Sequence, residues 1–167
     1  MMRLVLCFLF IQSCEKSSQP IQDIQSALLP NINVEKVVDS TPSFEQELIG
    51  LINDHRLEQG LAPLIKEDEL SFIALKHSQN MAMNLASFGH FGFSLRCEES
   101  RLVMGGGNWC AENVAMGYET PKSVFNGWIN SPGHRAIIEN SKATITGIAY
   151  AISGQGTFYW TQIFLEF

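Results

Sequence analysis

The chain has 167 residues, of which 46% are hydrophobic and 17% are charged, and its formal net charge at pH 7 is −6. This length and composition are typical of one globular domain and exclude a disordered chain. Because its 11 Lys and Arg residues form no cluster, the chain lacks the basic surface of a nucleic-acid-binding protein, and we expect no nucleic-acid partner.

An export signal is predicted at the N-terminus. Arg3 precedes an apolar run over residues 4–11, which is too short to span a bilayer as a permanent helix. The sequence Ile-Gln-Ser-Cys at residues 11–14 resembles a bacterial lipobox. Two interpretations follow: residues 1–13 are a lipoprotein-type signal peptide and Cys14 is the lipidated mature N-terminus, or a plain signal is cleaved and Cys14 is incidental. We favour the first because Cys14 directly ends the apolar run. The predicted location is outside the cytoplasm, anchored to a membrane or secreted.

Residues 14–42 are predicted to form a tether between this anchor and a domain at residues 43–167. The segment mixes serines, prolines and scattered charges, and it shows neither the helical nor the strand period.

Export decides how the four cysteines are interpreted. Cys7 is removed with the signal and Cys14 takes lipid, which leaves Cys97 and Cys110 in an oxidising compartment. We expect these two to form a disulfide that stabilises the domain by about 3 kcal/mol. The alternative is two free thiols. Two cysteines without histidines at metal-binding spacing are a poor zinc motif.

Two amphipathic helices are predicted at the start of the domain. The first begins at the capping-box sequence Ser43-Phe44-Glu45-Gln46 and continues to Gly60. The second runs from about Glu67 to Leu85, with apolar residues at helical spacing. His77 lies on its apolar face, and we interpret it as a buried histidine satisfied by a hydrogen bond rather than as a ligand.

A glycine-rich stretch at residues 88–118 is predicted to be irregular, and loops of this length inside a domain are usually functional or disordered. Its Gly105-Gly106-Gly107 run lacks the Lys-Ser/Thr pair of a phosphate-binding loop and predicts a flexible turn. Two further helices are predicted to begin at Thr120-Pro121 and at Ser131-Pro132. Trp128, on the apolar stripe of the first of these, is interpreted as a core residue.

Two strands at residues 144–152 and 157–164 are predicted to form a C-terminal hairpin. Both strands carry apolar residues on both faces, so both faces of the sheet require cover. The predicted fold class is therefore α+β, an α-β-α sandwich in which a small antiparallel sheet lies between helical layers. Gly147 and its small neighbours on one face allow a helix to approach that face closely.

One histidine has an informative position in its predicted helix. With Ser131 as N-cap, His134 is the third helical residue, where the positive end of the helix dipole disfavours a protonated imidazole. We therefore expect a neutral ring near pH 7, the form that accepts a hydrogen bond or binds a metal. His90 and Glu112 stand out in the irregular stretch, but spacing alone does not link these three residues.

Five motifs in chain order resemble the CAP superfamily, which comprises cysteine-rich secretory proteins, venom allergens, plant pathogenesis-related proteins and bacterial exported proteins with an SCP-like domain. They read LINDHRLEQGLAPL, FGHFGF, AENVAMG, NGWINSPGHRAIIEN and FYWTQIF, and the resemblance covers roughly residues 44–167. It implies an α-β-α sandwich with a surface cleft on which His90, Glu112 and His134 converge, the two histidines holding a divalent metal, commonly zinc. Ser131 replaces a second cleft glutamate of many members, and Ala111 replaces the glycine before the first.

The function expected from this cleft is binding of a lipid, a peptide or a cell-envelope ligand. The alternative is a metal-dependent, protease-like hydrolase with Glu112, His90 and His134 as its candidate catalytic residues, and a purely structural role also remains open. Because catalytic zinc usually has three protein ligands, a site with His90 and His134 as its only firm ligands predicts weak binding of zinc or another divalent cation. We expect a monomer that meets the membrane through Cys14.

Overall fold

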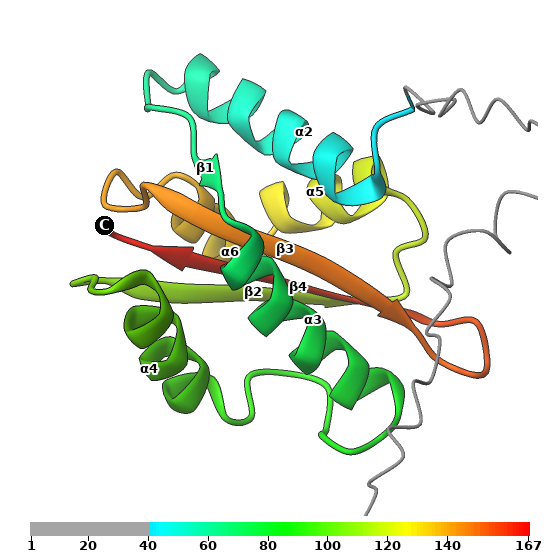
Figure 1. Ribbon diagram of the computed structural model, residues 1–167. Helices are drawn as coiled ribbons and strands as arrows, with labels where there is room; N and C mark the ends of the chain where they lie inside the picture. The colour runs from blue at the N-terminus through cyan, green and yellow to red at the C-terminus, as the bar shows by residue number, and fades with distance from the viewer. Residues whose placement is uncertain (1–40) are drawn as a thin grey trace, which may run out of the picture. The chain divides into compact units, whose positions relative to one another are not determined.

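The computed structural model describes residues 41–167, so the predictions for residues 1–13, for Cys14 and for nearly all of the tether lie outside the described residues. Figure 1 shows the helices on both sides of a twisted sheet. In chain order the elements are α2 (Phe44–Glu58), β1 (Ile65–Lys66), α3 (Asp68–Ala82), α4 (Phe93–Met104), β2 (Cys110–Met116), α5 (Pro121–Ile129), α6 (Pro132–Ile138), β3 (Ile145–Ile152) and β4 (Phe158–Leu165).

The four strands lie in the order β1-β3-β4-β2, so β2 forms one edge of the sheet. The predicted hairpin is confirmed, since β3 and β4 pair antiparallel from Ile145 opposite Leu165 to Ile152 opposite Phe158. β2 pairs antiparallel with the other side of β4. The sheet is mixed rather than purely antiparallel, because the two residues of β1 pair parallel with β3.

The sheet separates two hydrophobic clusters, which confirms the predicted α-β-α sandwich. One cluster joins α2, α5 and α6 to the sheet, with Trp128 and Trp160 as its largest members, both 1% exposed or less. The other joins α3 to β3 and β4 around Leu70 and Ile163. Gly147 accounts for the close approach of α3, because a Cβ atom on this residue would overlap the backbone of Leu70 and Ser71.

The predicted helix starts match the observed ones. The Ser43 hydroxyl accepts a hydrogen bond from the Gln46 amide, and the Gln46 side chain accepts one from the Ser43 amide, which completes the capping box. Thr120 and Ser123 cap α5 in the same reciprocal way. Within residues 41–167, no helix is long and apolar enough to cross a bilayer.

The prediction of an irregular stretch over residues 88–118 is wrong, because it contains α4 and β2. α4 lies between two glycines with positive φ, Gly92 at 76° and Gly105 at 78°, and its Leu95 is 77% exposed, so no apolar stripe marks the helix in the sequence. β2 is obscured in a different way. Its centre, Glu112-Asn113, is polar but buried, whereas a sequence pattern assigns such residues to solvent.

Candidate functional site

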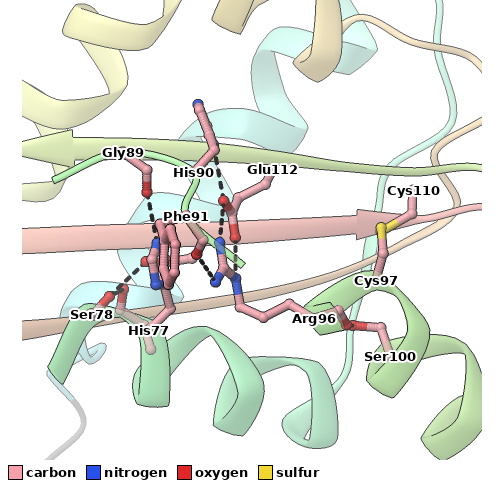
Figure 2. A network of polar contacts seen from close by, with 12 residues as sticks. His77, Ser78, Gly89, His90, Phe91, Arg96, Cys97, Ser100, Cys110 and Glu112 are labelled. Atoms are coloured by element: carbon pink, nitrogen blue, oxygen red, sulfur yellow. Dashed lines mark hydrogen bonds and ion pairs between the residues drawn. A yellow bond between two sulfur atoms is a disulfide. The ribbon is translucent and has the colours of Figure 1, made fainter. Parts of the chain in front are cut away.

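Glu112 is the central acidic group of the site and points from β2 toward α4. Its side chain is only 1% exposed. Arg96 of α4 donates two hydrogen bonds to it, from Nε to Oε2 at 2.7 Å and from Nη2 to Oε1 at 2.8 Å. A buried carboxylate needs such a charged partner, because transferring an unpaired charge out of water is strongly unfavourable. Figure 2 shows this two-pronged contact between the guanidinium and the carboxylate.

Arg96 also fixes the loop that precedes its own helix. Its Nη1 donates to the carbonyl oxygen of Phe91 at 2.7 Å. Gly92 makes room for this contact, since a Cβ atom there would lie 3.3 Å from Nη1, and its φ of +76° favours glycine. The next residue, Cys97, forms a disulfide with Cys110, which confirms the predicted pair. α4, the loop and β2 are therefore joined at one place.

His90 lies in that loop and contacts the same carboxylate. Its Nδ1 is 2.9 Å from Glu112 Oε1, and its side chain is 52% exposed. The loop is held from the other side by His77 of α3, whose Nε2 lies 2.8 Å from the Gly89 carbonyl oxygen (Figure 2). This hydrogen bond and the 2% exposure of His77 agree with its interpretation as a buried structural histidine.

His134 enters the site from α6 as the third residue of that helix. Its Nδ1 is buried and has no hydrogen-bond partner among residues 41–167. Burial is the main cause that lowers the pKa of its imidazole below the ordinary 6.5, and the nearby His90 ring lowers this pKa further whenever it is protonated. The expected neutral ring is thus supported by burial, which adds to the helix-dipole argument made from the sequence. Asn113 of β2 supports the backbone here by donating to the His134 carbonyl oxygen at 3.3 Å.

Two neighbouring hollows open at this end of the site. His90 and Glu112 line one of about 380 Å³, together with Phe93, Cys110, Ala111 and Ile137. His134 and Ser131 line another of about 310 Å³, whose remaining walls are mostly apolar: Phe88, Val114, Ala115, Met116, Tyr118, Gly127 and Trp128. The structure therefore brings His90 and Glu112 into direct contact, whereas His134 is their neighbour without a hydrogen bond to either of them.

The donor set does not fit a catalytic zinc centre. In the described part of the chain, no three His, Cys, Asp or Glu side chains are grouped to hold a metal ion. Both oxygens of Glu112 are engaged by Arg96, so this carboxylate is not free to act as a third ligand or as a base. The imidazoles of His90 and His134 remain as nitrogen donors, which is one fewer protein ligand than catalytic zinc sites usually have.

Arg96 is the site residue that the sequence reasoning missed. It lies in a stretch interpreted as irregular, and it meets Glu112 across 16 positions of sequence, a separation that no local pattern reports. The signal that could have found it is chemical. A buried glutamate requires a cation, and Arg96 and Arg101 are the basic residues between His90 and Glu112.

The chain is similar in sequence to known proteins over most of its length. A family model described as the cysteine-rich secretory protein family (CAP) matches residues 49–164. YkwD of Bacillus subtilis is 34% identical over 128 residues, which cover 75% of this chain and 48% of YkwD. The membrane protein YlbC of the same organism is 31% identical over 124 residues, which cover 73% of this chain and 34% of YlbC. The chain thus spans less than half the length of each of these two relatives.

Solved structures share the fold. An extracellular protein containing an SCP domain from Bacillus anthracis superimposes with a TM-score of 0.63 at 25% identity, covering 74% of this chain and 40% of the other. An outer surface protein from Borrelia burgdorferi superimposes with a TM-score of 0.62, covering 71% of this chain and 89% of the other. The identity of this second pair is 22%, so its likeness concerns the fold alone.

Proposed function

This chain belongs to the CAP family of cysteine-rich secretory proteins, and on that premise we propose that it acts outside the cytoplasm as a binding module whose cleft takes a lipid, a peptide or a cell-envelope ligand. The observation that carries the proposal is the state of Glu112. Its carboxylate is buried and hydrogen-bonded to Arg96 and His90. We therefore infer that it stabilises the structure of the cleft and does not act on a substrate.

The surroundings of the cleft favour binding over turnover. The hollow beside His134 has mostly apolar walls, and Ser131, Tyr118 and His134 are the lining residues with polar side-chain groups. Ligand pockets commonly combine such apolar walls with a few polar groups that set orientation. The half-exposed ring of His90 offers a further polar contact in the neighbouring hollow.

The location outside the cytoplasm rests on three independent supports. The Cys97–Cys110 disulfide is of a kind that persists in oxidising compartments. The structural neighbour from Bacillus anthracis is named as an extracellular protein. The predicted signal at residues 1–13 supplies a route of export, and lipidation at Cys14 would anchor the domain to a membrane. Cys14→Ala should then release the protein from the membrane fraction, and a variant that fractionates like wild type would refute the anchor.

A metal-dependent hydrolase remains the competing function for the same cleft. It would require Glu112 to leave Arg96 and to meet a metal held by His90 and His134. No observation in the described residues favours that rearrangement over the observed ion pair. We therefore assign the two histidines a weak affinity for divalent cations and no turnover.

One experiment separates the two functions. The exported protein is purified without added metal, and native mass spectrometry determines which lipids, peptides, glycans and metals it carries. The same sample is then screened for hydrolysis of peptides and cell-envelope glycans beside Glu112→Gln. Bound ligand without hydrolysis is the expected result. Hydrolysis that is present in wild type and lost in Glu112→Gln would establish the enzyme instead.

A further inference from the structure

We infer that Arg96 is the positioning residue of the cleft: it holds the Glu112 carboxylate in place, and Glu112 in turn orients His90 with Nδ1–H bound and Nε2 offered to a ligand. The contacts that carry this inference are the two bonds from Arg96 to Glu112 and the one between Glu112 and His90 (Figure 2).

Glu112 is held by a group that can only donate hydrogen bonds. Guanidinium groups donate hydrogen bonds and do not accept them, and they remain protonated in proteins. Arg96 donates to both carboxylate oxygens, and the Glu112 side chain is 1% exposed while that of Arg96 is 12% exposed. The two groups therefore form a charge-assisted pair that is largely shielded from water, in which both oxygens of Glu112 accept hydrogen bonds.

The proton between Glu112 and His90 lies on the histidine. An ionised carboxylate is only an acceptor, so the 2.9 Å contact from Oε1 requires the proton to lie on His90 Nδ1. A neutral imidazole carries one proton, and Nε2 is then the nitrogen with the free lone pair. Because the His90 side chain is 52% exposed, this acceptor belongs to a ring that a ligand can reach.

Arg96 is itself held in place by further contacts. Its third bond goes to the Phe91 carbonyl oxygen, one residue after His90, so the guanidinium fixes the backbone beside the histidine as well as the carboxylate opposite it. Its backbone amide bonds to the Gly92 carbonyl oxygen at 3.1 Å in the first turn of α4. The disulfide between Cys97 and Cys110 joins the neighbouring residues covalently. One side chain therefore positions the loop, the helix and the strand of the site.

The consequence for recognition is an acceptor nitrogen at a fixed place. The group of a ligand that fits His90 Nε2 is a hydrogen-bond donor, such as a hydroxyl or an amide N–H. This statement about the ligand rests on the proposed function. The tautomer of His90 does not, because it follows from contacts within the chain.

The test is the tautomer of His90, measured in the full chain by side-chain ¹⁵N chemical shifts at a pH well above the ordinary imidazole pKa. In wild type we expect the proton on Nδ1. In Glu112→Gln an amide NH₂ replaces one of the two oxygens, and where it takes the Oε1 position that Arg96 and His90 share, the His90 proton must move to Nε2. We therefore expect the Nε2-protonated tautomer to increase relative to wild type. A wild-type proton on Nε2, or no movement in Glu112→Gln, would overturn the inference.

Arg96 is tested directly by Arg96→Gln and Arg96→Lys. We expect Arg96→Gln to mix the two His90 tautomers and Arg96→Lys, which keeps the charge, to restore the wild-type state in part. Arg101→Gln is the matched control, since Arg101 lies on the same helix, donates to the Gly107 carbonyl oxygen and has no bond to Glu112. An unchanged tautomer in a folded Arg96→Gln would refute the positioning role. Should that variant not fold, the Glu112→Gln result decides the matter.

The proposed binding function and the inferred role of Arg96 can be refuted independently of each other. A protein that carries no ligand but shows the expected tautomers contradicts the proposed function and leaves the role of Arg96 intact. A ligand-bound protein whose His90 tautomer ignores Arg96 and Glu112 contradicts this inference alone.

Discussion

Cys97 and Cys110 join α4 to β2 at the base of the Arg96–Glu112 ion pair, one residue after the arginine and two residues before the glutamate. Their Cα atoms are 6.1 Å apart, and the bridge spans 13 positions of sequence. The covalent link and the ion pair thus hold the same two elements together. Loss of the link should affect both stability and the site.

Replacing both cysteines by serine should lower the free energy of unfolding by about 3 kcal/mol, because the unfolded chain regains the freedom that the closed loop removes. Urea unfolding of the double variant measures the loss, and reduced wild type should match it. Intact mass after alkylation without reductant checks the premise. Two alkylated thiols in freshly exported protein would contradict the disulfide.

Arg96→Gln should destabilise the fold by about 3 to 5 kcal/mol, since it leaves the buried Glu112 carboxylate without its cation. The control Arg101→Gln loses one hydrogen bond to the Gly107 carbonyl oxygen and should cost only about 1 kcal/mol. Both are measured by chemical denaturation at neutral pH. Equal losses would show that the buried pair has no special energetic role.

Acid should destabilise the domain in part through His77. Burial is the main cause that lowers the pKa of this imidazole below the ordinary 6.5. As the pH falls below 6.5, the unfolded chain takes up the proton first, so the free energy of unfolding decreases until the pH has passed the lowered pKa of the folded state. The contribution is fully present above 6.5. Urea unfolding across this range should show a smaller pH dependence for His77→Gln than for wild type, and equal dependence would contradict the assignment.

Gly147→Ala should destabilise the domain by about 3 kcal/mol or more, because the added methyl group meets the α3 backbone at Leu70 and Ser71, which cannot rotate away. Gly154→Ala is the matched control in the hairpin turn, where a Cβ atom has nothing within 4 Å. Thermal unfolding compares the two variants. A tolerated Gly147→Ala would show that α3 can shift along the sheet.

The sequence predicted well those elements that carry a local signal. Ser43 and Thr120 mark helix starts through capping, and the alternation of large and small residues around Gly147 indicates both the strand and the helix that covers it. α4 and β2 were not predicted, because tertiary contacts and not local sequence patterns stabilise them. α4 is tied down by Arg96 and a disulfide more than by an apolar stripe, and β2 buries polar residues that a pattern assigns to solvent.

The site likewise contains residues that the sequence predicted and one, Arg96, that it did not. The motifs around His90 and Glu112 suggested a shared cleft, and the structure brings these two side chains into hydrogen-bond contact. The sequence could not predict that Arg96 forms an ion pair with Glu112. Such a pair between α4 and β2 depends on how the tertiary fold places the helix beside the strand. That pair decides which chemistry remains, since it removes the carboxylate from the set of free donors.

Zinc should therefore bind weakly, through His90 and His134. With two imidazoles as donors, we expect micromolar or weaker affinity, which corresponds to about 8 kcal/mol or less. Affinity should fall as the pH drops through the range where histidine titrates, because the imidazole must lose its proton to bind a metal. Glu112→Gln should lower the affinity, because it favours the proton on His90 Nε2, the nitrogen that would bind the metal.

Calorimetric titration of zinc into wild type, His90→Ala, His134→Ala and Glu112→Gln tests this donor set. Each histidine variant should lose most of the heat while keeping the unfolding profile of wild type, because His90 is half exposed and the ring of His134 makes no hydrogen bond through its buried Nδ1 in the described chain. Unchanged heat of binding in both histidine variants would show that zinc binds at another part of the protein. A wild-type site much tighter than micromolar would mean that zinc draws the Glu112 carboxylate away from Arg96, which is the rearrangement that the hydrolase alternative requires.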